Sequence, residues 1–192
     1  MSKKKILILS ALIILSLDFL IYRFGAVKGD TVPAAQSAAV SESAPAGDGT
    51  YLITRVIDGD TVVVNMNGKE ETIRLIGVNT PETVDPRKPV QCFGKQASDF
   101  LKNMLPQGTM VTLTADPSQS DRDKYGQLLR YIYLGDVLVN EEIIVQGYGF
   151  EYTYDVPYEF QKDFKATQNY ASSGELGLWA PNTCDGKLEP AK

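Results

Sequence analysis

Acidic and amide side chains are concentrated in two short segments of the chain. Residues 58–60 read Asp-Gly-Asp and residues 79–82 read Asn-Thr-Pro-Glu, with Arg74 between them. Carboxylate, amide and carbonyl oxygens are the ligands that Ca2+ and Mg2+ prefer, and a nearby guanidinium can pair with phosphate. Taken singly, Asp-Gly-Asp is also ordinary turn chemistry and Arg74 an ordinary solvated strand residue. Only their combination favours a site.

The composition restricts the chemistry further. The 192-residue chain contains no histidine, and 19 Lys+Arg against 24 Asp+Glu give a formal net charge of −5. Without imidazole, a Ser-His-Asp or Cys-His nucleophile, a histidine-ligated zinc site and a histidine general base are excluded. The acidic balance also argues against binding of nucleic acid by bulk charge alone. Acid–base or metal chemistry must therefore use carboxylates, Tyr, Lys or Arg.

The first 24 residues predict export. Lysines at positions 3–5 precede an apolar stretch, Ile6–Tyr22, that is interrupted once by Asp18. This order is typical of a signal peptide, and about 17 apolar residues is also the lower limit for spanning a bilayer. Small residues suitable for cleavage come only near positions 34–38, so a cleaved signal and an uncleaved membrane anchor facing outside are both open. In either case we expect the domain outside the cytoplasm.

Composition also divides the rest of the chain. Residues 25–50 are rich in Ala, Ser, Pro and Gly without helical or strand periodicity, which is typical of a flexible linker. We expect the folded domain over residues 51–185 and a short tail over 186–192.

The hydrophobic pattern predicts the elements that must position the acidic segments. Strands are expected at residues 51–57, 61–66, 72–76, 110–115 and 128–134, and helices at 97–105, 140–147 and 157–173. Asn67-Gly68 is the strongest hairpin signal, and Asn140 could cap the second helix. The order predicts an α+β protein whose five strands close into a barrel. The hairpin would bring residues 58–60 and 79–82 to the same end of the sheet.

Several motifs resemble the staphylococcal nuclease (thermonuclease) family. They are Ile57–Val62, Ile73–Thr83, Asp123–Gly126, Val139–Glu142 and Gln146-Gly147. The similarity covers about residues 51–180, with the motifs in family order and at family-like spacing. It implies a five-stranded OB-fold barrel with three helices, and a calcium-dependent phosphodiesterase that cuts DNA and RNA to products ending in 3′-phosphate.

The resemblance also implies roles for single residues. The family's metal ligands match Asp60, Asn79 and the backbone carbonyl of Thr80. Its presumed general base matches Glu82, and its first phosphate-binding arginine matches Arg74. Such a set suits water attack on a phosphodiester, because the cation offsets phosphate charge while the carboxylate orients or deprotonates the water.

Substrate-binding positions follow from the same resemblance. Lys88, Lys124 and Tyr125 match positions that line the nucleotide pocket of the family. Tyr152 and Tyr154 resemble its tyrosine pair after a one-residue gap and could stack on the substrate. Because the gap leaves their alignment loose, a packed aromatic stripe explains these two tyrosines equally well.

Two positions depart from the family pattern. Asn79 stands where the family has Asp, which keeps an oxygen for Ca2+ but removes a charge. Gln127 stands where the family has the arginine that follows Tyr-Gly, and loss of one such donor typically costs about 10² to 10³ in rate. Arg130 is three residues further along a strand and so points to the opposite face. Arg122 lies in the preceding loop, where nothing in the sequence determines its direction.

Two cysteines remain, Cys92 and Cys184. An even pair in an exported chain favours a disulfide over two free thiols. The bridge would tie the C-terminal segment to the barrel and contribute on the order of 3 to 5 kcal/mol.

Three functions are compatible with these features. The first is a monomeric, extracytoplasmic, calcium-dependent nuclease acting on DNA and RNA, slowed by Asn79 and Gln127. The second is an OB-fold module that binds nucleic acid without efficient catalysis, and the third is a surface interaction domain. Retention of Asp60, Arg74 and Glu82 favours the nuclease, because a module that merely binds needs no base beside a metal site.

Overall fold

The computed structural model of the chain describes residues 48–87 and 89–190. The predicted export segment, the linker up to residue 47 and Lys88 lie outside these residues. The chain divides into two units, 1–41 and 42–192, and all described residues belong to the second unit. Within them, no helix has the length and apolarity needed to cross a bilayer.

Five strands close into a barrel, which confirms the predicted fold class. They are β1 (Gly49–Asp58), β2 (Thr61–Met66), β3 (Lys69–Leu75), β5 (Met110–Thr114) and β6 (Leu128–Leu134). The first three form an antiparallel meander, β5 pairs with β1, and β6 pairs with β5. Parallel pairing of β3 with β6 closes the cylinder and sets Arg74 opposite Leu129. The β2–β3 turn has the expected geometry, since Asn67 and Gly68 have φ of 55° and 89°.

Three two-residue strands complete the sheets. β7 (Val137–Leu138) pairs antiparallel with β6, and β4 (Val78–Asn79) pairs antiparallel with β8 (Phe150–Glu151). Two residues are too few to show a period of two, so hydrophobic patterning does not predict these strands. The β4–β8 pair nevertheless bears directly on the site, because it holds the backbone of Asn79 against Phe150.

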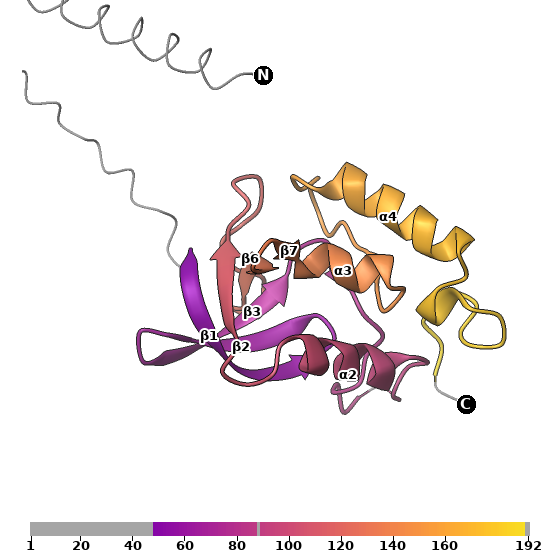
Figure 1. The fold of residues 1–192 in the computed structure, drawn as a ribbon, viewed down its shortest axis with the longest axis horizontal. Coiled ribbons are helices and arrows are strands. Elements are labelled where there is room, and N and C mark those ends of the chain that lie inside the picture. The colour runs from indigo at the N-terminus through magenta and orange to yellow at the C-terminus, as the bar shows by residue number, and fades with distance from the viewer. Residues whose placement is uncertain (1–47, 88, 191–192) are drawn as a thin grey trace, which may run out of the picture. The chain divides into compact units, whose positions relative to one another are not determined.

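Three helices pack outside the strands, with α4 lying beyond α3 (Figure 1). They are α2 (Gly94–Met104), α3 (Val139–Val145) and α4 (Gln161–Ser173), and a short 3-10 turn, η2 (Gly177–Trp179), follows α4. α2 packs against β1, while α3 packs against β6 on one side and α4 on the other. Each helix contributes fully buried side chains to the common core, among them Leu101, Ile143 and Phe164.

The predicted cap at Asn140 is wrong. The residue preceding α3 is Leu138, and Asn140 lies within the helix with its side chain fully buried. Its Oδ1 accepts a hydrogen bond from the backbone N–H of Ile132 at 2.9 Å, and its Nδ2 donates to the carbonyl of Ile76 at 2.9 Å. Buried backbone groups need partners, and this requirement outweighs the usual preference of Asn for exposed helix ends.

Candidate functional site

The two acidic segments meet at one end of the barrel. The Asp58–Asp60 turn joins β1 to β2, and residues 79–82 lead out of β4. Asp60 Oδ2 accepts a hydrogen bond from the backbone N–H of Thr80 at 3.0 Å. A Cβ at Gly59 would lie 2.8 Å from Thr80 Oγ1, so the turn requires glycine for this close approach. The convergence expected from the hairpin is therefore present in the structure.

Asp60 lies at the centre of this group. Its carboxylate is buried, with Oδ1 accepting from Thr61 Oγ1 at 2.8 Å and Oδ2 lying 3.0 Å from Nη2 of Arg74. Arg74 also donates to the backbone carbonyls of Asp60 and Leu75, at 3.4 and 3.3 Å. The guanidinium is thus held in one direction by the barrel, beside the carboxylate predicted to bind the cation.

The carboxyl groups of Glu82 and Asp58 interact with each other beside Asp60. Glu82 Oε1 accepts the backbone N–H groups of Val84 and Asp85, at 2.8 and 3.0 Å. Burial acts to raise the pKa of Glu82, but these two hydrogen bonds and a further one involving Asp58 outweigh it, so that its pKa is lowered. Burial and the charge of Asp60 raise the pKa of Asp58, against the opposing hydrogen bonds from Thr83. The site thus lowers the pKa of the Glu82 carboxyl and raises that of Asp58.

Buried oxygen atoms at this end of the barrel are of the kind that a hard cation binds. Thr80 is buried, and its Oγ1 has no hydrogen-bond partner among residues 48–87 and 89–190. Nor do three or more Asp, Glu, Cys or His side chains of those residues form a group that could hold a metal. A cation here would therefore rely on the Asp60 carboxylate together with amide and carbonyl oxygens from Asn79 and Thr80. Such neutral donors suit Ca2+, at lower affinity than an additional carboxylate would give.

Gln127 directly precedes β6, and its backbone N–H donates to Oδ1 of Asp123 at 2.9 Å. Arg74 lies opposite Leu129 in the parallel β3–β6 pair, and side chains two residues apart on a strand share a face. Arg130, opposite Leu75, points to the other face and is fully buried. There its Nη2 lies 2.6 Å from Oδ1 of Asp121. The expectation that Arg130 points to the face opposite Arg74 is therefore confirmed.

Arg122 is also directed elsewhere. Its Nη1 lies 3.0 Å from Oε2 of Glu71 and donates to the carbonyl of Gly126 at 2.6 Å. The structure thus brings Arg74 to the acidic end of the barrel but commits Arg122 and Arg130 to ion pairs with other carboxylates.

The predicted substrate-binding residues form an exposed aromatic group. Lys124 Nζ lies 5.2 Å from the ring centroid of Tyr125 and 5.7 Å from that of Tyr154, while the Tyr152 and Tyr154 rings are 6.3 Å apart. The two paired tyrosines are 43% and 69% exposed, which argues against a packed stripe. Lys88, also predicted for this group, lies outside the described residues.

Motif comparison missed two residues in the loop that follows Glu82. Arg87 binds the Asp85 carboxylate through Nε and Nη2, at 2.8 and 2.9 Å, and this pairing raises the pKa of its guanidinium. Gln91 is hydrogen bonded to Glu82 itself. Both lie outside the family-like motifs, and their only sequence signal is their proximity to Glu82 in a segment with two prolines.

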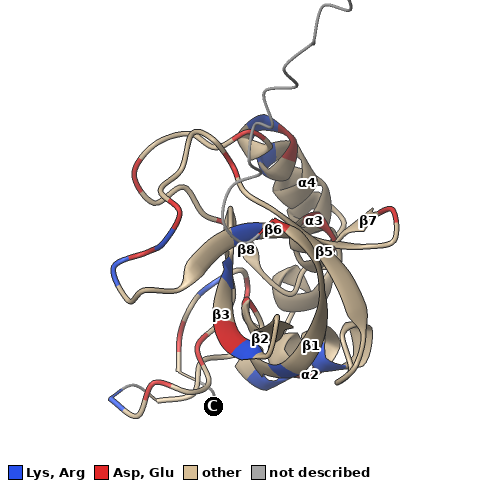
Figure 2. Cartoon of the chain, turned by 90° about the vertical axis from the view of Figure 1, so that its left-hand side faces the viewer, with Lys and Arg blue, Asp and Glu red and all other residues tan. Residues whose placement is uncertain are grey.

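Charges of both signs are interspersed over the strands and loops (Figure 2). Strand β3, for example, carries Lys69, Glu70, Glu71 and Arg74 within seven residues. Any polyanion bound at this site would accordingly depend on a few local cations rather than on a broad basic face.

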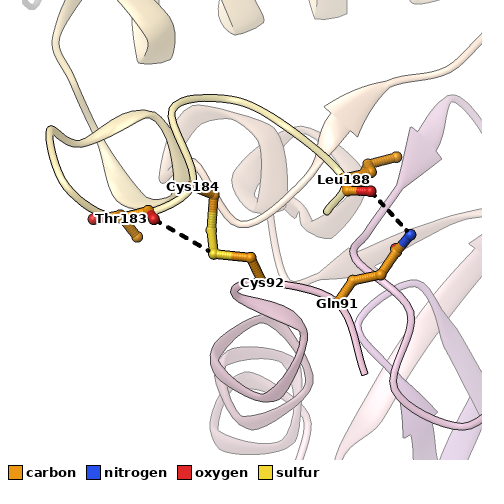
Figure 3. The surroundings of a disulfide bond; sticks show 5 residues. All are labelled: Gln91, Cys92, Thr183, Cys184 and Leu188. Atoms are coloured by element: carbon orange, nitrogen blue, oxygen red, sulfur yellow. Dashed lines mark hydrogen bonds between the residues drawn. A yellow bond between two sulfur atoms is a disulfide. The ribbon is translucent and has the colours of Figure 1, made fainter. Parts of the chain in front are cut away.

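A disulfide links the start of α2 to the C-terminal segment (Figure 3). Cys92 precedes α2 by two residues, Cys184 follows η2, and their Cα atoms are 5.8 Å apart. The bridge joins the paired cysteines that composition indicated, and it lies one residue from Gln91.

Comparison with known proteins agrees with this geometry. The sequence pattern of the family described as "Staphylococcal nuclease homologue" matches residues 72–181. Thermonuclease of Staphylococcus hyicus is 35% identical over 175 residues, covering 91% of this chain and 95% of that protein. Thermonuclease of Staphylococcus intermedius is 38% identical over 130 residues, 68% of this chain and 76% of that protein. Endonuclease YncB of Bacillus subtilis (strain 168) is 36% identical over 129 residues, 67% and 60% of the two chains. With the fold, the converging acidic segments and these relatives in agreement, the chain belongs to the staphylococcal nuclease family.

Proposed function

We propose that this chain is a nuclease that hydrolyses phosphodiester bonds of DNA and RNA, uses Ca2+ and acts outside the cytoplasm. The observation that carries the proposal is the assembly of Asp60, Arg74 and Glu82 at one end of the barrel. The names of the relatives, thermonucleases and an endonuclease, support the same reaction class.

Each group of the site has a separate role in the proposed hydrolysis. Glu82, with its lowered pKa, is ionised at neutral pH and accepts the proton of the attacking water. Arg74 binds the non-bridging phosphate oxygens, and the Lys124 and tyrosine group holds the nucleotide. Bound by Asp60, Asn79 and the Thr80 carbonyl, Ca2+ would supply positive charge that offsets the charge on the phosphate.

We expect this enzyme to be slow. Asn79 contributes no charge toward the cation, and Gln127 offers only a neutral hydrogen bond where phosphate charge increases in the transition state. Arg130 and Arg122 are engaged with Asp121 and Glu71 and do not compensate.

A nucleic-acid-binding module is the second candidate. The observation in its favour is that the exposed group of Lys124, Tyr125 and Tyr154 is intact while the second arginine is missing. Such a protein would bind single strands by stacking without cutting them.

Digestion of plasmid DNA and RNA by the purified chain, with Ca2+ and with a chelator, tests the proposal. Glu82→Gln should abolish cleavage, whereas Glu70→Gln, which changes an exposed acid in the β3 hairpin strand, should not. Cleavage that persists in chelator would contradict the calcium requirement. Binding of single-stranded DNA without cleavage would favour the module.

Location and assembly need separate tests. The proposed export rests on residues 1–24, and retention of the protein in the membrane fraction would distinguish an anchor from a cleaved signal. We further propose a monomer, which sedimentation of the purified chain would test.

A further inference from the structure

Gln91 holds the backbone of Glu82 from both sides. The side-chain Oε1 of Gln91 accepts the N–H of Glu82 at 2.8 Å, and the N–H of Gln91 donates to the Glu82 carbonyl at 2.9 Å. Both hydrogen-bonding groups of the Glu82 main chain are thus bound by a residue nine positions later. Gln91 closes the base of the loop between them.

That loop also orients the Glu82 carboxylate. Glu82 Oε1 accepts the N–H groups of Val84 and Asp85, which are the second and third residues beyond it. The carboxylate is therefore tied to its own loop, and the loop is tied to the domain at Gln91. A shift at the base of the loop would move the carboxylate relative to Asp60 and Arg74.

Gln91 is held in turn by the C-terminal segment (Figure 3). Its Nε2 donates to the carbonyl of Leu188 at 3.4 Å, and its backbone forms an isolated bridge with Pro190. The adjacent N–H of Cys92 donates to the carbonyl of Glu189 at 2.7 Å. The segment that provides these carbonyls is joined to Cys92 by the disulfide at Cys184.

We propose that Gln91 is a positioning residue for Glu82, and that the Cys92–Cys184 disulfide acts through Gln91 to hold the Glu82 carboxylate in place. The inference rests on the proposed role of Glu82. The activity of the site would then depend on the intact disulfide. Its reduction would release the C-terminal segment that braces Gln91 without altering any group that touches substrate. A displacement of about 1 Å at a catalytic group can cost about 10² in rate.

Steady-state kinetics on a DNA oligonucleotide with Ca2+ test the role of Gln91. Gln91→Ala should lower kcat at least about tenfold with KM little changed, because the carboxylate moves while the phosphate-binding and aromatic groups stay. Gln91→Glu keeps the acceptor for the Glu82 N–H but loses the donor to the Leu188 carbonyl, so it should recover only part of the lost kcat. Gln96→Ala removes an exposed glutamine of α2 and serves as the matched control. An unchanged kcat in Gln91→Ala overturns the proposal.

Coupling to the disulfide is tested in a double-mutant cycle. Cys92→Ser with Cys184→Ser should lower kcat in the parent, at a temperature where circular dichroism shows it folded, but add little in the Gln91→Ala background. Additive losses would overturn the link between the tail and Gln91.

Limited proteolysis provides a readout that is independent of activity. Trypsin can cut after Arg87, whose side chain is 81% exposed in the loop that Gln91 closes. Gln91→Ala should be cut there several-fold faster than Gln96→Ala, because local opening of the loop becomes easier. Equal cleavage rates in the two variants would contradict the proposal that Gln91 holds this loop closed.

The kinetics of two variants distinguish an error in the role of Gln91 from an error in the role of Glu82. If Glu82→Gln retains parental kcat, the assignment of Glu82 is wrong whatever Gln91 does. If Glu82→Gln is inactive while Gln91→Ala keeps full kcat, Glu82 stands and the positioning role is refuted.

Discussion

Removal of the disulfide should reduce stability by an amount that follows from the chain length it encloses. Cys92 and Cys184 are separated by 92 positions in sequence. In the chain-entropy treatment, a loop of this length lowers the entropy of the unfolded state enough to stabilise the fold by about 4.6 kcal/mol. The double change Cys92→Ser with Cys184→Ser should remove this contribution.

The same free energy sets the expected change in the unfolding temperature. A domain of about 140 residues has an unfolding entropy of about 0.3 kcal/mol per kelvin at its midpoint. Division of 4.6 kcal/mol by this entropy predicts that Tm falls by about 15 °C.

Thermal unfolding followed by circular dichroism measures this change. The parent with reductant should match the Ser variant, and reductant should leave the Ser variant itself unchanged. A fall in Tm of only about 3 °C, equivalent to about 1 kcal/mol, would refute the reasoning, because the bridge would then not restrict the unfolded chain as calculated.

Three further changes test the site and the core. Gln127→Arg should raise kcat at least about tenfold by adding a charged donor at the position where the family has an arginine, and an unchanged rate would mean that another cation already stabilises the phosphate. Asn79→Asp should tighten Ca2+ binding in calorimetry, since it adds a charged oxygen donor, and equal affinity would exclude this side chain as a ligand. Buried Asp116 accepts hydrogen bonds from the Tyr131 hydroxyl and the Glu159 N–H, at 2.6 and 2.7 Å. Burial raises its pKa, but these bonds outweigh burial and lower it, so the stability it contributes is present at neutral pH and lost as pH falls through its folded pKa. Asp116→Asn should therefore cost about 1 to 3 kcal/mol in denaturant unfolding at pH 7 and less in acid, and a pH-independent difference would contradict this account.

Local chemistry made the barrel predictable. Alternating Val, Ile and Thr mark the strands, and Asn67-Gly68 adopts the positive φ values that the hairpin needs. The helix expected at residues 97–105 corresponds to α2, because helical periodicity and helix-breaking residues can be recognised within a few positions. Asp60, Asn79 and Glu82 were recognisable for the same reason, since each lies in a contiguous motif.

Contacts between distant segments were not predictable in this way. Asn140 donates to the carbonyls of Ile76 and Arg130 rather than capping its helix, because buried backbone groups need hydrogen-bond partners. Tyr152 and Tyr154 are exposed because of how their loop leaves β8, a two-residue strand without a detectable period.

The sequence by itself determined the fold class, the acidic segments and the absence of histidine chemistry, since these depend on residue type and short spacing. Tertiary structure decided that Arg130 is buried and paired with Asp121 while Arg74 is paired with Asp60, because the β3–β6 register sets the face on which each side chain lies. It alone also brought Leu188 against Gln91, and Gln91 against Glu82, since these contacts depend on where the C-terminal segment crosses the domain.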